Sequence, residues 1–140
     1  MFYPAKFAPD ADGGFTVTFR DVPEAITQGD DMDEAREAAA DALLTAMDFY
    51  FEDSRQVPLP SSPEDGELLV ELPMSAWAKV LLLNAMVEDK VRPSDLAKAM
   101  HVQRQEVNRI LDLHHTTKID TLVAAFRATG RDLQVTPVRL

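Results

Sequence analysis

Residues 93–111 read PSDLAKAMHVQRQEVNRIL, and this stretch decides the fold of the second half of the chain. Pro93-Ser94 is a favourable helix start and predicts a short helix that ends before His101-Val102. A second helix is predicted from Gln103 to about Leu111. The small residue Ala97 stands where two crossing helices would approach, and a turn residue follows four positions later. This spacing predicts a helix-turn-helix.

The second of these helices separates into an apolar and a polar face. Val102, Val107 and Ile110 are spaced to face the core. The outward positions hold long side chains of the kind that contact base edges and phosphates. We therefore predict DNA contacts from Ser94, Gln103, Arg104, Gln105, Asn108, Arg109, Thr117 and Lys118. The polar face of an ordinary helical bundle carries similar residues, so spacing alone leaves that alternative open.

His101 occupies a turn position that usually holds glycine. A positive φ is costly for histidine but tolerable, so we expect either a strained turn or a slightly different geometry. His114 and His115 are adjacent, so on a helix they would point about 100° apart. We expect them to cap a helix or contact phosphate rather than to share a metal ion.

The whole region after Pro73 has helical patterning, with breaks at Arg92-Pro93, around His101, near His114 and at Gly130. These breaks predict four helices. Ser75 is the predicted N-cap of the first, and Thr117, with Asp120 three residues later, is the predicted cap of the last. The buried stripe of that last helix is predicted at Ile119, Leu122, Val123 and Phe126. The helix order resembles the Cro/repressor-like family.

The residue pattern of the first half of the chain predicts a small sheet covered by one helix. Residues 2–7 and 15–19 are short aromatic stretches around Asp12-Gly13-Gly14, which indicates a β-hairpin. A third short strand is predicted around residues 25–28 and a last one at residues 68–72. Between them a helix is predicted from Asp30, with its buried stripe at Ala35, Ala39, Leu43, Ala46 and Tyr50. The unit is therefore β-β-β-α-β.

Charge is distributed unevenly along the chain. Residues 1–73 carry 17 acidic and 4 basic side chains, a balance of −13, whereas residues 74–140 carry 7 acidic and 10 basic ones, a balance of +3. Halves with opposite fields are expected to meet different kinds of partner. We predict a partner-binding domain over residues 1–73 and a DNA-binding domain over residues 74–140. An acidic surface that only aids solubility is the simpler alternative.

Composition narrows the class of protein. The 140 residues are 46% hydrophobic, which supports a core rather than disorder. The chain has no cysteine, which excludes disulfides, thiolate nucleophiles and cysteine-based zinc sites. No stretch approaches the ~20 uninterrupted apolar residues of a membrane helix, and the N-terminus lacks the pattern of a signal peptide. We expect a cytosolic protein without a metal or other cofactor.

Several segments resemble the HicB antitoxin family. The first is residues 21–30, DVPEAITQGD, followed by Glu34-Ala35 and an alanine-rich helix. The resemblance continues over residues 42–53, ALLTAMDFYFED, and over residues 57–61, VPLPS. It returns at KVLLLNA, residues 79–85, and at LHHTTKID, residues 113–120. Nearly the whole chain is covered, and the form of the family with a helix-turn-helix is indicated.

The resemblance implies an α+β protein: a partial RNase H-like β-β-β-α-β unit without catalysis, followed by an all-α Cro/repressor-like helix-turn-helix domain. It implies that the first unit binds HicA, a small basic toxin that cleaves mRNA, and that the antitoxin represses its own operon. An acidic surface suits a partner built to hold RNA phosphate. Because one short recognition helix covers few base pairs, we also expect a homodimer or a dimer of dimers on an inverted repeat.

Two other functions are consistent with parts of the sequence. A nuclease of this fold would hold two magnesium ions through acids such as Asp10, Asp12, Asp21 and Asp30, but these acids lie in turns without convergent spacing. A ligand-sensing repressor would use the helix-turn-helix and have no protein partner. The neighbouring gene distinguishes a ligand-sensing repressor from an antitoxin. An antitoxin is expected beside a short reading frame that encodes a basic protein, and a ligand-sensing repressor is not.

Overall fold

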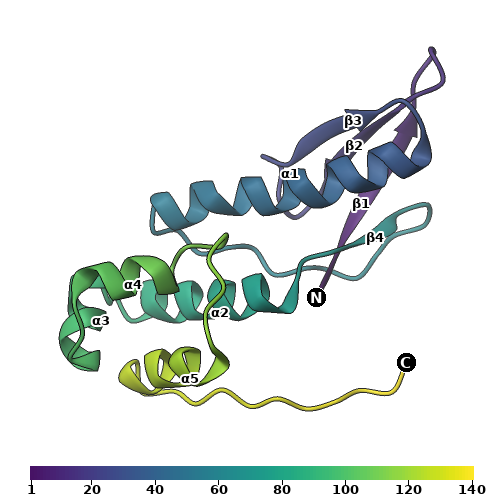
Figure 1. Cartoon of the computed structure of the whole chain (residues 1–140). Helices are drawn as coiled ribbons and strands as arrows, with labels where there is room; N and C mark the ends of the chain where they lie inside the picture. Colours follow the sequence, from purple (N-terminus) through teal and green to yellow (C-terminus); the bar gives the residue numbers. More distant parts are fainter.

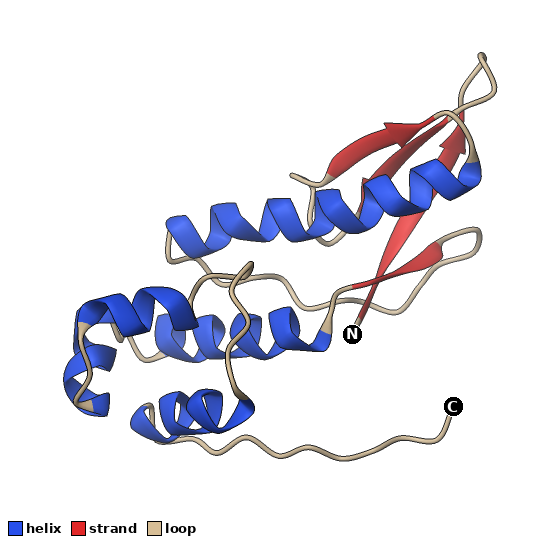
Figure 2. Ribbon diagram, in the orientation of Figure 1, coloured by secondary structure: helices blue, strands red, loops and turns tan.

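The computed structural model describes all 140 residues, with the strands gathered at one end of the molecule and the shorter helices at the other (Figures 1 and 2). The order β-β-β-α-β followed by four helices is the predicted one. The elements are β1 (Phe2–Pro9), β2 (Phe15–Phe19), β3 (Ile26–Gly29), α1 (Met32–Glu52), β4 (Leu68–Glu71), α2 (Met74–Glu88), α3 (Pro93–Met100), α4 (Arg104–Ile110) and α5 (Ile119–Ala128). The protein is therefore of the mixed α+β type.

The sheet is antiparallel throughout, in the order β3-β2-β1-β4. The predicted β1–β2 hairpin is present, and Gly13 in its turn has a φ of +93°, which glycine adopts without steric cost. Gly29, at the end of β3, is required for a different reason. A Cβ there would lie 2.4 Å from the backbone nitrogen of Ala35, so only glycine lets α1 begin this close to the sheet.

The long helix α1 covers one face of the sheet (Figure 1). Its N-cap is Asp31, whose carboxylate accepts a hydrogen bond from the backbone N–H of Glu34 at 2.8 Å. The predicted buried stripe is confirmed, and the structure adds Met47 to it. This apolar face binds α1 to the sheet and leaves its charged face in solvent.

Two hydrophobic cores stabilise the molecule, and the first extends past residue 73. That core joins the sheet and α1 to Ala76, Val80 and Leu83 of α2, and to Leu113 beyond α4. The second core joins Leu82 and Met86 of α2 to buried residues of α3, α4 and α5. Two different faces of α2, about 100° apart around the helix axis, thus contribute to the two cores. The division into domains at residue 73 stays a prediction. α2 lies after that position and packs in both cores.

Two predicted helix caps are wrong. α2 begins at Met74 with Pro73 at the N-cap position, because the N–H of Trp77 already donates to the carbonyl of Pro73 at 2.9 Å. Ser75 therefore lies inside the first turn. α5 begins at Ile119 with Lys118 at its N-cap position, so Thr117 lies outside the helix. As a result Ile119 is 55% exposed, not buried as predicted, whereas Leu122 and Phe126 are buried and Val123 is half-buried.

The last residues, after α5, form no helix or strand and run along the helical end of the molecule (Figure 1). Leu133, Gln134 and Val135 line an apolar groove with Trp77 of α2 and Leu122 of α5. Val135 itself is 74% exposed. None of the helices has both the length and the apolar character required to cross a membrane.

Candidate functional site

The turn between α3 and α4 has the strained geometry, one of the two that the sequence leaves open. His101 has φ 57° and ψ 43°, in the left-handed region. Its N–H donates to the carbonyl of Lys98 at 3.2 Å, and the N–H of Val102 donates to that of Ala97 at 3.0 Å. These bonds satisfy carbonyls at the end of α3. The chain can therefore turn sharply and begin α4 at Arg104.

α4 separates its side chains as predicted. Val107 and Ile110 are buried in the second core, and Val102 packs against that core in the preceding turn. The opposite side is exposed and carries the predicted DNA-contacting residues Gln103, Arg104, Gln105, Asn108 and Arg109. α4 and its N-cap residue Gln103 therefore present five polar or basic side chains to solvent, while the apolar side of α4 fixes it to the rest of the bundle.

The two arginines of this face have weak local partners. Nε of Arg104 donates to Oδ1 of Asn108 at 3.2 Å, and Nη1 of Arg109 donates to Oε2 of Glu106 at 3.2 Å. Both pairs are exposed. Exposed pairs of this kind contribute little stability, about 0–1 kcal/mol, so an incoming phosphate or base edge can replace them at low cost.

The other three predicted contact residues lie away from α4 and its N-cap. Ser94 is half-buried in the first turn of α3, and Lys118 is exposed just before α5. The hydroxyl of Thr117 is buried without a hydrogen-bond partner, so it does not face solvent. Gln103 lines one cleft with Asp120 and Thr121, which places the starts of α4 and α5 side by side.

Lys79 is a residue of this region that the sequence analysis did not single out. It is only 1% exposed, and its ammonium group donates to three backbone carbonyls, those of Arg109 at 3.3 Å, Asp112 at 2.7 Å and His115 at 2.6 Å. Burial lowers the pKa of Lys79, and the nearby carboxylate of Asp112 opposes this shift. The signal in the sequence was a lysine inside the apolar stripe of α2, between Ala76 and Val80.

The turn after α4 contacts the first half of the molecule. Leu113 is buried in the first core. Nε2 of His114 lies 2.9 Å from Oδ2 of Asp48 on α1, and this carboxylate raises the pKa of His114. The ring of His114 therefore pairs with a carboxylate and does not cap a helix.

The acids considered for a nuclease are engaged elsewhere or dispersed. Asp10 accepts a hydrogen bond from the hydroxyl of Thr16, and Asp21 accepts from the backbone and hydroxyl of Ser61. No group of three histidine, aspartate or glutamate side chains is placed so that it could hold a metal ion. The geometry therefore offers no metal centre built from these residues.

The acidic surface of the first half divides into paired and unpaired carboxylates. Arg20 pairs with Glu67 at 2.7 Å, and this hydrogen bond lowers the pKa of Glu67. Arg20 also approaches Glu64 and Asp21. The exposed face of α1 differs, because no hydrogen bond or salt bridge engages the side chains of its exposed acids Asp33, Glu37 and Asp41. Their negative potential is directed to solvent, where it favours a basic partner.

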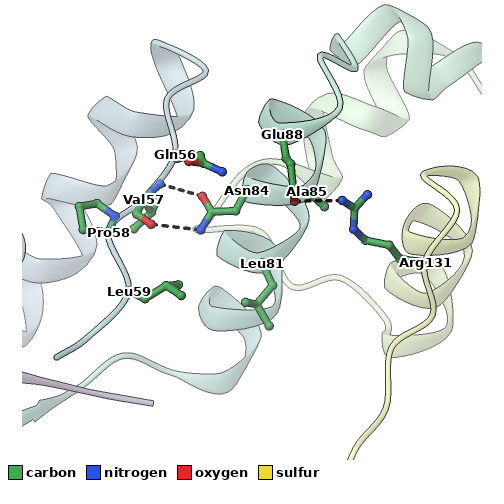
Figure 3. A pocket seen from close by; sticks show the side chains of 9 residues that line it. All are labelled: Gln56, Val57, Pro58, Leu59, Leu81, Asn84, Ala85, Glu88 and Arg131. Carbon is green, nitrogen blue, oxygen red and sulfur yellow. Dashed lines mark hydrogen bonds and ion pairs between the residues drawn. The ribbon is translucent and has the colours of Figure 1, made fainter. Parts of the chain in front are cut away.

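A cleft of about 610 Å³ lies where the segment after α1 meets α2 (Figure 3). The side-chain amide of Asn84 both accepts from the N–H of Val57 at 2.7 Å and donates to its carbonyl at 3.1 Å. At the far end Arg131 pairs with Glu88 and with Asp89. The cleft is a junction in which α2 holds the segment and the end of the chain, and its lining contains no catalytic arrangement.

Comparison with known proteins points to one family. The family of the HicB-like antitoxin of bacterial toxin–antitoxin systems matches residues 2–81. This match includes the sheet, α1 and the first half of α2, whose Ala76 and Val80 belong to the first core.

Curated relatives match almost the whole chain. Antitoxin HicB of Escherichia coli strain K12 is 46% identical over 138 residues, which are 99% of this chain and 100% of that protein. Antitoxin HicB 1 of Photorhabdus laumondii subsp. laumondii is 48% identical over 133 residues, 95% of this chain and 84% of that protein. Antitoxin HicB of Pseudomonas fluorescens is 33% identical over 132 residues, 94% of this chain and 90% of that protein.

Proposed function

The chain belongs to the HicB-like antitoxin family of bacterial toxin–antitoxin systems, and from this premise we propose that it neutralises a HicA-type, mRNA-cleaving toxin and represses its own operon by binding operator DNA. Its role is that of an antitoxin and not of an enzyme, as for the relatives it matches. The two activities are proposed for different ends of the molecule. Operator binding uses the helical end, and toxin binding uses the sheet and α1.

The DNA-binding proposal depends most on α4. We assign α3 and α4 to a Cro/repressor-like helix-turn-helix, with α4 as the recognition helix. The observation that supports this assignment is the division of α4, in which Val107 and Ile110 are buried while Arg104, Gln105 and Asn108 face solvent. Glutamine and asparagine can bond adenine, and arginine can bond guanine or phosphate, in the major groove. Contacts to the DNA backbone or to flanking bases are assigned to Ser94, Gln103, Arg109 and Lys118. The hydroxyl of Thr117 is buried.

The toxin-binding proposal rests on the acidic half. The β-β-β-α-β unit is proposed to be a partial RNase H-like fold that binds the toxin as a protein partner. The unpaired acids of α1, Asp33, Glu37 and Asp41, supply a surface that competes with RNA phosphate for a basic toxin. Opposite charge would raise the rate of encounter with such a partner.

We further propose that the protein acts as a homodimer or a dimer of dimers on an inverted-repeat operator. Two recognition helices related by a twofold axis would meet half-sites about 34 Å apart, or a multiple of that distance. The exposed apolar tail, with Val135 74% and Val138 80% exposed, is the proposed dimer contact. A repressor of this kind works in the cytosol, where a bacterial operator lies.

Co-purification and footprinting test the proposed function together. The chain is co-expressed with the product of the neighbouring gene, and the purified sample is footprinted on the upstream DNA of its own operon. We expect a stable complex with a small basic protein and protection of two symmetric half-sites. A monomer without a partner that protects no specific sequence would contradict the proposal, and sedimentation of a chain ending at Arg131 decides the role of the tail alone.

A further inference from the structure

Lys79 is a charged side chain in a place where charge is costly. It lies on α2 between Ala76 and Val80, two residues of the first core, and it is 1% exposed. A buried ammonium group is tolerated only when its donors are satisfied. An ammonium has three donors, and Lys79 has three acceptors within 3.3 Å.

All three acceptors lie at or after the end of α4. The carbonyl of Arg109 belongs to the last turn of the helix, and those of Asp112 and His115 belong to the turn that follows. The C-terminal end of a helix carries a partial negative charge and leaves carbonyls without helical partners. Lys79 therefore bonds one carbonyl of that end and two of the following turn from a fixed position on the neighbouring helix.

We propose that Lys79 is the positioning residue that holds α4 in the orientation needed to read the operator. The inference rests on the proposed DNA-binding function and adds to it a residue that does not itself touch DNA. α4 contains only the residues Arg104–Ile110, so its apolar side offers just two buried residues, Val107 and Ile110, to fix it. Few apolar contacts leave a short helix free to rotate or slide, whereas three directional hydrogen bonds to the end of α4 and to the turn after it restrict that motion.

The segment that Lys79 binds also contacts the first half of the molecule. Leu113 enters the first core, and His114 pairs with Asp48 of α1 at 2.9 Å. Lys79 therefore fixes the end of α4 to α2 at the place where the helical end meets the sheet and α1. Loss of the ammonium group is expected to free α4 relative to both cores while the core contacts of α2 remain.

The test compares Lys79→Met with Lys90→Met. Methionine has similar length to lysine but no donors. The side chain of Lys90 is exposed and makes no hydrogen bond or ion pair, and only its backbone N–H donates, to Val87, so the control makes the same change in charge. For Lys79→Met we expect operator affinity to fall about tenfold or more relative to non-specific DNA, the size of the loss of a base contact. Toxin binding should not change. Lys90→Met should leave both properties unchanged.

A chemical rescue separates positioning from packing. The chain has no cysteine, so Lys79→Cys introduces a unique thiol. Alkylation of the unfolded protein with 2-bromoethylamine then forms a thioether that restores an ammonium group at the length of lysine, with bromide as the leaving group. After refolding, beside wild type taken through the same cycle, we expect operator discrimination to be lost in the cysteine form and restored in the aminoethylated form.

Three outcomes would overturn the role of Lys79. They are unchanged discrimination in Lys79→Met, no recovery after aminoethylation, and loss of toxin binding together with operator binding, since Lys79 would then support the whole fold and not α4. If wild type shows no preference for the operator, the proposed function fails instead. Hydrogen exchange of the α4 amides in the free protein still decides the positioning role in that case, because faster exchange is expected only in Lys79→Met.

Discussion

At the scale of single residues, the pair of His114 and Asp48 joins the turn after α4 to α1. The two side chains are 55% and 34% exposed, so the pair contributes little on an absolute scale, less than about 1 kcal/mol. Its value is that histidine titrates near neutral pH, which gives this contact between the two ends of the molecule a pH dependence that can be measured.

The direction of that dependence follows from the raised pKa of His114. A histidine whose pKa is higher in the folded state stabilises the protein below its unfolded pKa of about 6.5, and the contribution is lost as the pH rises through the folded pKa. We expect His114→Gln to lower the free energy of unfolding more at pH 6 than at pH 8, as measured by urea unfolding. His115→Gln is the control, because the ring of His115 makes no hydrogen bond. An equal effect of His114→Gln at both pH values would contradict the pairing.

Single residues also show what a sequence can and cannot predict. The turn at His101 follows from the local spacing of two helices, and of the two expected geometries the structure has the strained one, with a positive φ. The caps at Ser75 and Thr117 were wrong, because each helix start is set by a neighbouring backbone bond that composition does not reveal. The partners of Lys79 and His114 come from segments far away in the chain, so no local pattern predicts them.

At the scale of elements, α2 is the helix on which the division into domains depends. One face of it contributes Ala76, Val80 and Leu83 to the first core, and a neighbouring face contributes Leu82 and Met86 to the second. The sequence predicted α2 because apolar residues dominate it. It assigned the helix to the second half because the charge balance changes sign there, but charge reports on surfaces and not on cores.

We expect the first half to remain separable, with a stability that depends on α2. Burial of Val80 and Leu83 contributes roughly 1.5–3 kcal/mol each, a large fraction of the ~5–15 kcal/mol typical of a domain. A fragment of residues 1–73 should bind toxin without binding DNA. It should be less stable than a fragment of residues 1–90, in which Leu82→Gln and Met86→Gln make polar the face of α2 that the second core no longer covers. Urea unfolding and a toxin-binding assay on both fragments check this. Equal stability would show that α2 adds nothing to the first core, and a folded fragment 1–90 that fails to bind toxin would move the toxin surface to the helical end.

At the scale of the whole molecule, the two proposed activities lie at opposite ends and are joined through α2 and the turn after α4. Unpaired acids face solvent on α1, and polar and basic side chains face solvent on α4. If the proposed assignments hold, opposite charge at the two ends would direct a basic toxin to the acidic end and DNA to the helical end. Toxin and operator should therefore bind independently apart from any coupling through that junction.

We propose that α4 reads DNA while the sheet and α1 bind toxin, and a triple variant of α4 separates the two activities. The triple substitution Arg104→Ala, Gln105→Ala and Asn108→Ala removes three exposed side chains of α4 and leaves Val107 and Ile110 in place. Each lost base contact should cost ~1–3 kcal/mol of discrimination. Arg127→Ala, an exposed arginine on α5, is the matched control.

The measurement is the ratio of operator affinity to non-specific DNA affinity, taken with toxin affinity on the same samples. We expect the triple variant to lose most of this ratio and to bind toxin like wild type, while Arg127→Ala keeps both properties. An unchanged ratio in the triple variant would contradict the assignment of α4 as the reading helix.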